Sequence, residues 1–581
     1  MTMIRQLSKA AIPQLKGSFF RFTSSYPNIN SFRTYTPEDG FVLSSIYEPI
    51  TLPDLTVDQY VWKNVSKWQN KVAISCGVTG RKYTYSKLRD HCAALAVRLQ
   101  TKFNLKRGDV IGICLPNVPE YAICLLGACE AGITTTTINP IYTAAEISRQ
   151  LVSSRPKIIF TLSETYSTVE AAAEMAKLRC TIVTVKTKLG ETIPNGAIDF
   201  TELMSTKHVD FNSLDKQVVD IDDTFVLPFS SGTTGLPKGV MLSHLNITSN
   251  CEQLDAKLPD KRLILPTTND FQDVLPSVLP FFHIYGLVIS LVSKLALGCK
   301  IVALPKFEPE GFLTTLAEHK ATYLNLVPPI VLFLANSDKT AKRHLEHVRT
   351  IMSGAAPLGA SDVERFHKKA PHTEFMQGYG MTESSPLTLI APKGIPNRAT
   401  VGFVASSTEA KIIKVDDPNF VGCDIDETGE LMIRGCQVMK GYLNNPEATK
   451  ETIVKGNWLR TGDLATYDSN GLFYIKDRLK ELIKVKGFQV APAELEEVLR
   501  DHPNIDEAAV IGIPHDTYGE VPKAFIVQKK ATDVTEKELH AFVNERLSEY
   551  KQLKGGIQFV DSVPKNASGK LLRRKLKALY S

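Results

Sequence analysis

The chain has 581 residues, of which 43% are hydrophobic, 8% aromatic and 22% charged, and its net charge is +6. This composition excludes a disordered or fibrous chain, and the length exceeds that of one ordinary domain. A charge excess this small on so long a chain predicts no nucleic-acid partner. The ten cysteines form no CxxC pair and have no zinc-ligand spacing, which favours free thiols in a reducing compartment.

The first 37 residues differ in composition from the rest of the chain. They hold five basic residues, several serines and no acidic residue before Glu38, and apolar residues recur among them at near-helical spacing. This pattern is typical of a mitochondrial transit peptide, with processing predicted near residues 21–24. The alternative is a leader that carries no targeting signal and leaves the protein in the cytosol. Residues 578–581 do not match the peroxisomal SKL-type signal.

From about residue 40 to residue 475, short apolar β-branched runs alternate with helical patterns. Runs at 110–114, 157–160 and 300–304 precede helix-like stretches at 119–131, 169–178 and 310–319. The alternation predicts a parallel α/β architecture.

An apolar stretch at 274–293 has the length of a membrane span. Pro276 and Pro280 interrupt it, and His283 lies near its middle. Two prolines and a helical pattern only after Tyr285 predict a buried strand, a turn and a core helix, and no transmembrane segment.

A second, smaller domain is predicted from residue 477 to residue 581. A strand at 473–475 leads into the charged segment 476–486, and Pro492 then opens a helix. Thr535 and Glu538 form a capping box before a further helix. The predicted fold is therefore α/β, with a large N-terminal domain and a small C-terminal α+β domain.

The strongest local motif is SSGTTGLPKG, at residues 230–239, directly after the apolar run 225–229. A strand that leads into a turn rich in Gly, Ser and Thr suits a polyphosphate, because backbone N–H groups and hydroxyls can donate to phosphate oxygens while Lys238 adds a charge. The motif is not a Walker A loop, because Gly239 follows Lys238 where that loop has Ser or Thr. A flexible surface turn is the ordinary alternative.

Together with five further motifs, this loop resembles the adenylate-forming superfamily of acyl-CoA synthetases, coumarate–CoA ligases, luciferases and peptide-synthetase adenylation domains. The motifs are GYGMTE at 378–383, WLRTGD at 458–463, KDRLK at 476–480, KVKGFQ at 484–489 and PKNASGK at 564–570, in the family's order. PFFHIYG at 280–286 and KGFQVAPAELE at 486–496 are most similar to the coumarate–CoA ligase and luciferase branch. The resemblance implies a multi-subdomain adenylation domain at 40–475, a mobile C-terminal domain at 477–581 and a hinge at 477–480.

The resemblance also implies which residues bind ATP and magnesium. Lys570 is expected to bridge the carboxylate and the α-phosphate, Thr382 to donate to the α-phosphate, and magnesium to bind beside Glu383. Asp463 would accept from the ribose hydroxyls. The implied ATP or AMP contacts are Ser230, Ser231, Gly232, Thr233, Thr234, Gly235, Lys238, Gln377, Gly378, Tyr379, Thr382, Asp463, Arg478, Lys480, Lys484, Gln489 and Lys570.

Taken singly, these residues have ordinary interpretations. Glu383 could merely complement a helix dipole, Asp463 could be a turn residue, and Lys570 could be a solvated lysine in a basic tail. Their joint occurrence in the family's order favours the catalytic interpretation.

The acid is expected in a pocket that the resemblance places around His283, Tyr285, Ile289, Gly354, Ala355 and Gly378. His283 would lie at the acyl–adenylate junction. Plant hydroxycinnamate ligases tend to have a small polar residue near the position of Ile289. Because isoleucine can neither donate nor accept a hydrogen bond, it favours an apolar acid, either a medium- or long-chain fatty acid or an aryl acid.

Coenzyme A is expected to contact Lys306, Lys486 and Gly487, which match CoA-binding positions of relatives. Lys484 belongs to the loop that enters the site for thioester formation in the family. With Lys570, His283 and Thr382, it completes the predicted catalytic set.

These residues predict an ATP-dependent acid–CoA ligase that forms an acyl-AMP and then an acyl-CoA from a small carboxylic acid, ATP and CoA, with Mg²⁺. A luciferase-like monooxygenase shares every motif and remains an alternative. An adenylating enzyme that loads a separate carrier protein is a second alternative.

Overall fold

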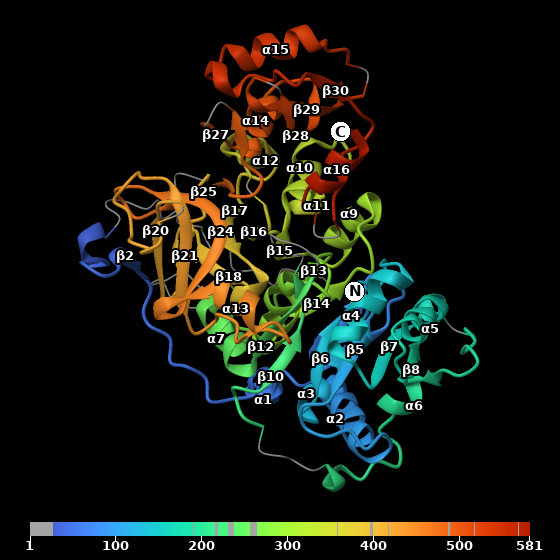
Figure 1. The fold of residues 1–581 in the computed structure, drawn as a ribbon. Helices are drawn as coiled ribbons and strands as arrows, with labels where there is room; N and C mark the ends of the chain where they lie inside the picture. Colours follow the sequence, from blue (N-terminus) through green and yellow to red (C-terminus); the bar gives the residue numbers. More distant parts are fainter. Residues whose placement is uncertain are drawn as a thin grey trace, which may run out of the picture.

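The computed structural model describes residues 27–188, 190–214, 219–230, 237–255, 264–356, 358–395, 399–415, 417–485, 488–515, 517–530, 532–566 and 569–580. The processing point predicted at 21–24 lies outside these residues. Figure 1 shows a large N-terminal domain with the small C-terminal domain, coloured orange-red, resting on one end of it. Each domain has its own hydrophobic core, so the predicted α/β fold with a separate small domain is confirmed.

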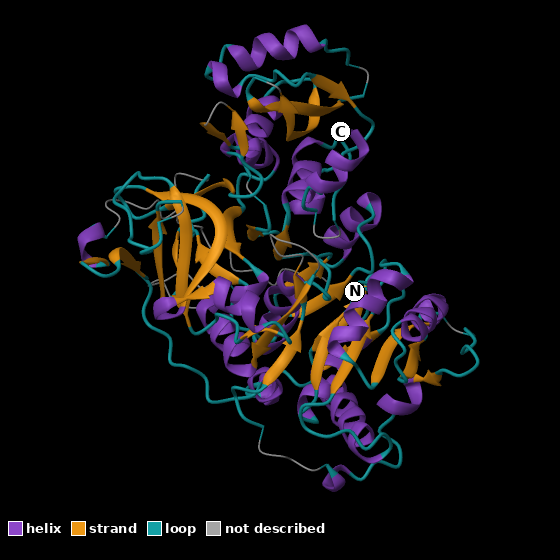
Figure 2. Ribbon diagram, viewed as in Figure 1, coloured by secondary structure: helices purple, strands orange, loops and turns teal. Residues whose placement is uncertain are grey.

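The first subdomain is a nine-stranded sheet flanked by helices (Figure 2). Its strands are parallel from β10 to β9, as the alternating pattern predicted, and antiparallel at β12. In sheet order they are β11 (Phe229–Ser230), β12 (Lys238–Ser243), β10 (Thr224–Leu227), β6 (Thr134–Thr137), β5 (Val110–Cys114), β7 (Ile158–Leu162), β8 (Thr181–Val185) and β9 (Ile198–Asp199), with β22 (Gly441–Tyr442) paired to β12. Its helices are α2 (Tyr85–Thr101), α3 (Glu120–Glu130), α4 (Ala144–Ser154), α5 (Tyr166–Met175), α6 (Phe200–Met204) and α7 (His244–Asp255), with η3 (Ser163–Thr165) and η4 (Phe211–Ser213).

The second subdomain contains two smaller sheets. The four-stranded sheet has the order β13 (Val274–Ser277), β14 (Lys300–Ala303), β3 (Val72–Cys76) and β4 (Lys82–Thr84). The five-stranded sheet has the order β15 (Tyr323–Leu326), β16 (Thr350–Ser353), β17 (Glu374–Gly380), β18 (Leu387–Ile390) and β19 (Phe403–Val404). The helices are α1 (Val57–Trp62), η2 (Val65–Lys67), the π-helix η5 (Tyr285–Val292), α8 (Ser293–Ala296), α9 (Pro309–Glu318), α10 (Pro328–Asn336), α11 (Lys342–Leu345), α12 (Ala360–Lys369) and η6 (Thr382–Ser384).

The uncharged stretch 274–293 forms β13, a turn and the π-helix η5, so the predicted strand, turn and core helix are confirmed. Every residue of η5 is buried, which fits a core helix that is apolar on all sides. Within the described residues, no helix combines the length and apolarity that a bilayer crossing requires.

The third subdomain is a seven-stranded antiparallel sheet, which the sequence pattern did not distinguish from the parallel parts. Its order is β1 (Arg33–Thr36), β2 (Gly40–Ser44), β20 (Thr408–Ile413), β21 (Gly429–Gly435), β24 (Trp458–Tyr467) and β23 (Ile453–Val454), with β25 (Phe473–Arg478) paired to β24. The helices α13 (Pro446–Thr452) and η7 (Lys455–Asn457) connect its strands.

Residues 27–37, which the composition assigned to a leader, are part of this third subdomain. The 3₁₀ helix η1 (Ile29–Ser31) buries Ile29, and Phe32 follows it into the core. Arg33 forms an ion pair with Asp424, and its guanidinium carbon lies 3.6 Å from the centroid of the Phe41 ring. The predicted leader boundary at residue 37 is therefore too late, because composition alone cannot show that this segment pairs with strand β2. A cut at 21–24 would leave the hairpin whole.

Within its described residues, the small domain has a five-stranded sheet, three α-helices and a short 3₁₀ helix. The strand order is β27 (Phe488–Val490), β26 (Ile483–Val485), β29 (Gly519–Gln528) and β28 (Ile505–His515), with β30 (Ile557–Phe559) paired to β29. The helices are α14 (Pro492–Arg500), α15 (Glu536–Asn544), η8 (Glu549–Lys551) and α16 (Arg573–Tyr580). The capping box of Thr535 and Glu538 is present at α15, as predicted. Leu576 packs α16 into the domain, so the basic tail is a docked amphipathic helix.

Candidate active site

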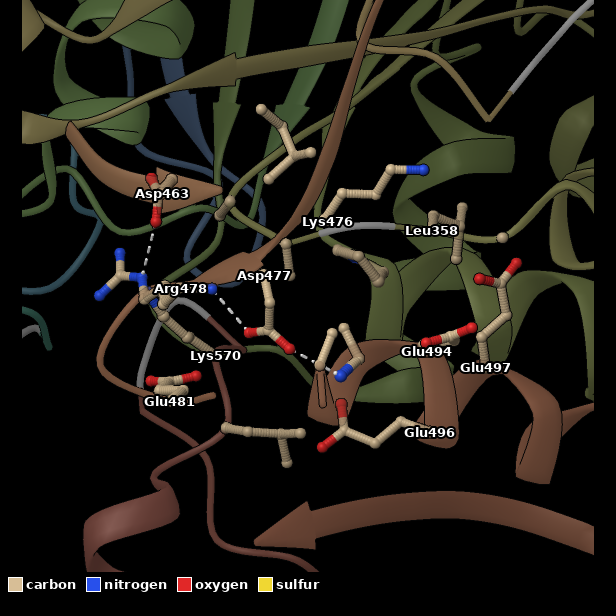
Figure 3. A pocket seen from close by; sticks show the side chains of 18 of the residues that line it. Leu358, Asp463, Lys476, Asp477, Arg478, Glu481, Glu494, Glu496, Glu497 and Lys570 are labelled. Atoms are coloured by element: carbon tan, nitrogen blue, oxygen red, sulfur yellow. Dashed lines mark hydrogen bonds and ion pairs between the residues drawn. The ribbon is translucent and has the colours of Figure 1, made fainter. Parts of the chain in front are cut away.

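A cavity of about 800 Å³ lies between the two domains (Figure 3). Residues of both domains line it, from β17, β24 and β25 on one side and from α14 and the loop before α16 on the other. Seven of the residues predicted for the site line this cavity: Ala355, Gln377, Gly378, Tyr379, Asp463, Arg478 and Lys570. Residues separated by more than 200 positions in the sequence are thus brought to one place.

Asp463 is held at the cavity by two neighbours. Its Oδ2 accepts a hydrogen bond of 2.6 Å from the hydroxyl of Tyr379, and its Oδ1 lies 3.4 Å from Nε of Arg478. Arg478 stands directly opposite Asp463 because β24 and β25 are paired in that register. Burial and the carboxylate of Asp463 raise the pKa of Tyr379 well above its usual value, so Tyr379 stays a donor at neutral pH. The carboxylate therefore has a fixed orientation, as an acceptor for ribose hydroxyls requires.

Lys570 reaches the cavity from a tight loop of the small domain. The side-chain oxygen of Asn566 accepts from the N–H of Lys570 at 2.8 Å, and the N–H of Asn566 donates to the carbonyl of Lys570. Gly569 has φ of +78°, which favours glycine, and an added Cβ would lie 3.1 Å from Val327 in the large domain. The loop thus packs its glycine on the large domain and presents Lys570 to the site.

Burial and neighbouring charges set the protonation states of Lys570 and His283. Burial, and then the positive charge of Arg478, lower the pKa of Lys570 to about 8. Burial, and then the charge of Lys570, lower the pKa of His283 to about 4, so His283 is neutral at neutral pH. The Nδ1 of His283 accepts from the N–H of Tyr285 at 3.3 Å, which places the proton on Nε2. His283 can therefore donate one hydrogen bond beside Lys570 without adding charge.

The lowered pKa of Lys570 predicts a pH dependence for the first half-reaction. Only the ammonium form can neutralise two approaching anions, so kcat/KM for ATP in pyrophosphate exchange should fall as the pH rises through about 8. Lys570→Arg keeps its charge to much higher pH, so its remaining activity should lack this alkaline limb. Pyrophosphate exchange measured from pH 6.5 to 10 tests this. The same limb in both proteins would show that another group titrates.

Glu383 has the surroundings expected of a magnesium ligand. It is buried, and its Oε1 accepts from Ser230 Oγ at 2.7 Å and from the hydroxyl of Tyr442 at 2.9 Å. Both of these bonds end on one oxygen, which leaves Oε2 for a cation. Within the described residues, no group of three or more His, Cys, Asp or Glu side chains could hold a metal. A single carboxylate suits Mg²⁺ that is bound mainly through substrate phosphates and water.

Several cations gather where the phosphates are expected. Partial burial, and then the charges of Lys238 and Arg574, lower the pKa of Lys480. Lys238 also lies 4.8 Å from the ring centroid of Tyr442, the residue that holds Glu383. Like charges repel, so an arrangement that brings Lys238 and Lys480 together favours a polyanion between them.

Other predicted residues lie away from the cavity or outside the described residues. Lys484 is exposed on the β26–β27 hairpin, and Gln489 belongs to β27. Lys306 is exposed on the large domain, in an ion pair with Glu308. Ser231, Gly232, Thr233, Thr234, Gly235, Lys486 and Gly487 lie outside the residues that the structure describes. Of the acyl-pocket residues, Tyr285 and Ile289 are buried in η5, and Gly354 packs against the Tyr285 ring.

The sequence analysis missed the residues that fix the inner packing of the small domain and those that join it to the large domain. Arg573 forms a two-pronged pair with Glu496 at 2.7 and 2.8 Å and contacts Glu481 beside the predicted hinge. Asp477 accepts from the N–H of Ala493 at the start of α14. Ser361 Oγ donates to Asp501 across the domain boundary at 2.7 Å. Charged residues after residue 476 were visible in the sequence, but their partners were not.

Comparisons with known proteins agree with this geometry. A model of the AMP-binding enzyme family matches residues 61–443, and a model of the AMP-binding enzyme C-terminal domain matches residues 494–570. The chain is 39% identical to 4-coumarate–CoA ligase 1 of Arabidopsis thaliana over 92% of this chain and 94% of that protein. It is 37% identical to a probable 4-coumarate–CoA ligase 1 of Dictyostelium discoideum over 97% and 98% of the two chains.

Solved structures of the same fold include two aryl-acid ligases. A benzoate CoA ligase from Burkholderia xenovorans superposes with a TM-score of 0.77 at 25% identity, over 90% of this chain and 99% of that one. The anthranilate CoA ligase AuaEII, in complex with anthranoyl-AMP, superposes with a TM-score of 0.82 at 22% identity, over 91% and 98%. The chain therefore belongs to the AMP-binding enzyme family, the adenylate-forming acid–thiol ligases, and within it is similar to the coumarate–CoA ligases.

Proposed function

We propose that this protein is an ATP-dependent acid–CoA ligase that works in two half-reactions at one site. The observation that carries the proposal is the position of Lys570. A lysine from the small domain packs into the large domain beside Arg478, Asp463 and His283, where an acid and the α-phosphate of ATP would meet. This is the arrangement that the first half-reaction needs.

In the first half-reaction a carboxylate oxygen of the acid attacks the α-phosphorus of ATP and pyrophosphate leaves. Lys570 lowers the repulsion between the two anions, and the Nε2–H of His283 can donate to the carboxylate or to the phosphate. Asp463 orients the ribose. Lys238 and Lys480 stabilise the charge on the departing pyrophosphate, and magnesium held beside Glu383 would supply further positive charge there.

In the second half-reaction the thiol of CoA loses its proton and attacks the acyl carbonyl, and AMP leaves. Lys570 occupies the approach to that carbonyl, whereas the exposed hairpin with Lys484 lies outside the cavity. The small domain would therefore rotate between the half-reactions, taking Lys570 out and bringing the hairpin in.

We further propose that the acid is apolar where it contacts η5, as in a medium- or long-chain fatty acid or an aryl acid. Ile289 and Tyr285 are buried in η5, where every residue is apolar except Ser290 and the hydroxyl of Tyr285. That hydroxyl already donates to the carbonyl of Met352 at 3.0 Å. Neither side chain offers a phenolic substrate the free polar group that it would need at this point.

A panel of fatty and aryl acids tests the function. Purified protein is mixed with ATP, Mg²⁺ and each acid, with and without CoA, and pyrophosphate and thioester are measured separately. We expect pyrophosphate exchange that depends on the acid, and thioester only with CoA. Acid-dependent adenylate with no thioester at any CoA concentration would favour loading of a carrier protein, and light or oxygen uptake would favour a monooxygenase.

A further inference from the structure

A group of buried polar side chains lies behind the acyl pocket, between the five-stranded sheet and the helices η5 and α8. Lys294 is 1% exposed, and its Nζ lies 4.9 Å from the ring centroid of Tyr323. Its one hydrogen bond is long, 3.4 Å to the hydroxyl of neighbouring Ser293. No described carboxylate pairs with it directly, although burial of an ammonium group normally requires a partner, and the charges of Asp255 and Asp273 only partly offset the effect of burial on its pKa.

Tyr323, which Lys294 contacts, and the polar residues beside Tyr323 on the sheet also lack good partners. The hydroxyl of Tyr323 donates to the thioether sulfur of Met352 at 3.7 Å, which is a weak acceptor. The Oδ1 of Asn325 and the hydroxyl of Thr350 are buried without a hydrogen bond. Tyr323 pairs with Thr350 and Asn325 with Met352 in the parallel register of β15 and β16, so all four side chains lie on one face of the sheet.

This polar group is continuous with the predicted acyl pocket. The Nδ2 of Asn325 donates to Ser290 Oγ at 3.0 Å and lies 3.5 Å from the carbonyl of Ile289. An added Cβ on Gly378 would lie 2.7 Å from the terminal methyl of Met352. The flexible side chain of Met352 therefore separates Gly378, at the acyl end of the pocket, from the hydroxyl of Tyr323 and the amine of Lys294.

Buried polar groups with unfilled hydrogen-bonding capacity are rare, and each one calls for an explanation such as a ligand. Three of them side by side, Tyr323, Asn325 and Thr350, together with a cation, would be replaced by apolar side chains if the site only had to hold fatty chains. Methionine is the side chain that moves most easily to admit a ligand. Burial lowers the pKa of Lys294, which makes a partner for its charged form still more valuable.

We propose that the acid activated by this protein carries a second oxygen acceptor, a carboxylate or a carbonyl group, at the end remote from the reacting carboxyl. Lys294 and the hydroxyl of Tyr323 bind this acceptor after Met352 moves aside. The apolar middle of the acid lies along Ile289 and Tyr285. This inference rests on the proposed function, because it names the substrate class of the same site.

The test compares acids of equal length that end in a methyl, a carbonyl or a carboxylate group, in straight-chain and aryl series. The measurement is kcat/KM in pyrophosphate exchange. We expect the wild-type protein to favour an acceptor-bearing acid over its methyl-terminated match by at least about tenfold. In Lys294→Met the preference for carboxylate should disappear, and in Tyr323→Phe the preference for carbonyl should fall, while methyl-terminated acids are still used.

Lys300→Met is the matched control, because Lys300 is a partly buried lysine on β14 that does not face the pocket residues. It should keep the wild-type ratios, and melting curves show whether each variant is folded. If the wild-type protein uses methyl-terminated acids as well as, or better than, acceptor-bearing acids, the inference is overturned whatever the variants show. That result leaves the proposed ligase function intact. Unchanged ratios in both folded variants also overturn it. No exchange with any acid overturns the proposed function and this inference together.

Discussion

Replacing Lys570 with alanine is expected to abolish adenylate formation while sparing thioester formation from supplied acyl-AMP. Lys570 is the cation that the small domain brings between two anions, and loss of such a contact costs about 3–4 kcal/mol in the transition state, a factor of about a hundred or more. Acyl-AMP already contains the bond that Lys570 helps to form, so the second half-reaction does not need it. Pyrophosphate exchange and transfer of the acyl group from acyl-AMP to CoA are measured on the same preparation.

Lys575→Ala is the matched control for this variant. Lys575 belongs to the same basic tail but is exposed on α16. It should keep both half-reactions, which separates the role of Lys570 from the general charge of the tail. Pyrophosphate exchange at the wild-type rate in Lys570→Ala would remove Lys570 from the mechanism.

A bulky residue at Gly487 is expected to give the opposite pattern. In the proposed second half-reaction pantetheine would pass close to this residue, and glycine has no side chain to obstruct it. Exchange should survive and transfer to CoA should fail. Equal loss of both activities would show that the loop has only a structural role.

The sequence predicted the elements whose signals are local. The apolar run 110–114 is β5, and Pro492 and Thr535 mark the starts of α14 and α15. Prolines, capping boxes and short β-branched runs act within a few residues, so they can be interpreted without knowing the fold. The linear motifs likewise placed Lys570, Asp463 and Arg478, which the structure brings to one cavity.

Features that depend on distant partners could not be predicted. Arg573 pairs with Glu496, 77 positions earlier, and with Glu481, 92 positions earlier, and no local sequence pattern predicts either pair. The π-helix η5 is buried on all sides, so its apolar residues carry no periodicity that separates it from an α-helix. The burial of Lys294 was not predicted either, because an isolated lysine after an apolar run is also typical of an exposed helix end.

Lys480→Pro is expected to uncouple the two half-reactions. The ladder between β24 and β25 extends through Arg478, and the N–H of Leu479 still donates to the carbonyl of Gly462 at 2.9 Å. Lys480 is therefore the first residue after β25 whose backbone makes no hydrogen bond to the described part of the large domain. The N–H of Glu481 then donates to the carbonyl of Arg478 and forms a turn. A rotation of the small domain would have to use the backbone dihedrals at this residue.

Proline at position 480 fixes φ near −65° and removes the N–H. Lys480 is exposed, and its N–H makes no hydrogen bond with any described residue, so the substitution breaks no backbone hydrogen bond in the present arrangement. We expect adenylate formation to continue at the rate of Lys480→Ala, whereas thioester turnover should fall by about a hundredfold further, because a misplaced loop cannot complete the second site. Rapid-quench measurement of acyl-AMP and acyl-CoA in one reaction would show acyl-AMP accumulating.

Lys480→Ala is the control, because it removes the same charge beside Lys238 and leaves φ free. If Lys480→Ala and Lys480→Pro lose adenylate formation equally, the loss comes from the missing lysine side chain. A loss seen only in Lys480→Pro comes from the restricted backbone at the hinge. Proline also restricts Leu479 to extended backbone, so circular dichroism and a melting curve must show that the junction has folded. If folded Lys480→Pro completes both half-reactions at wild-type rates, the small domain does not rotate about this residue, and Lys570 must leave the site by movement elsewhere in the chain.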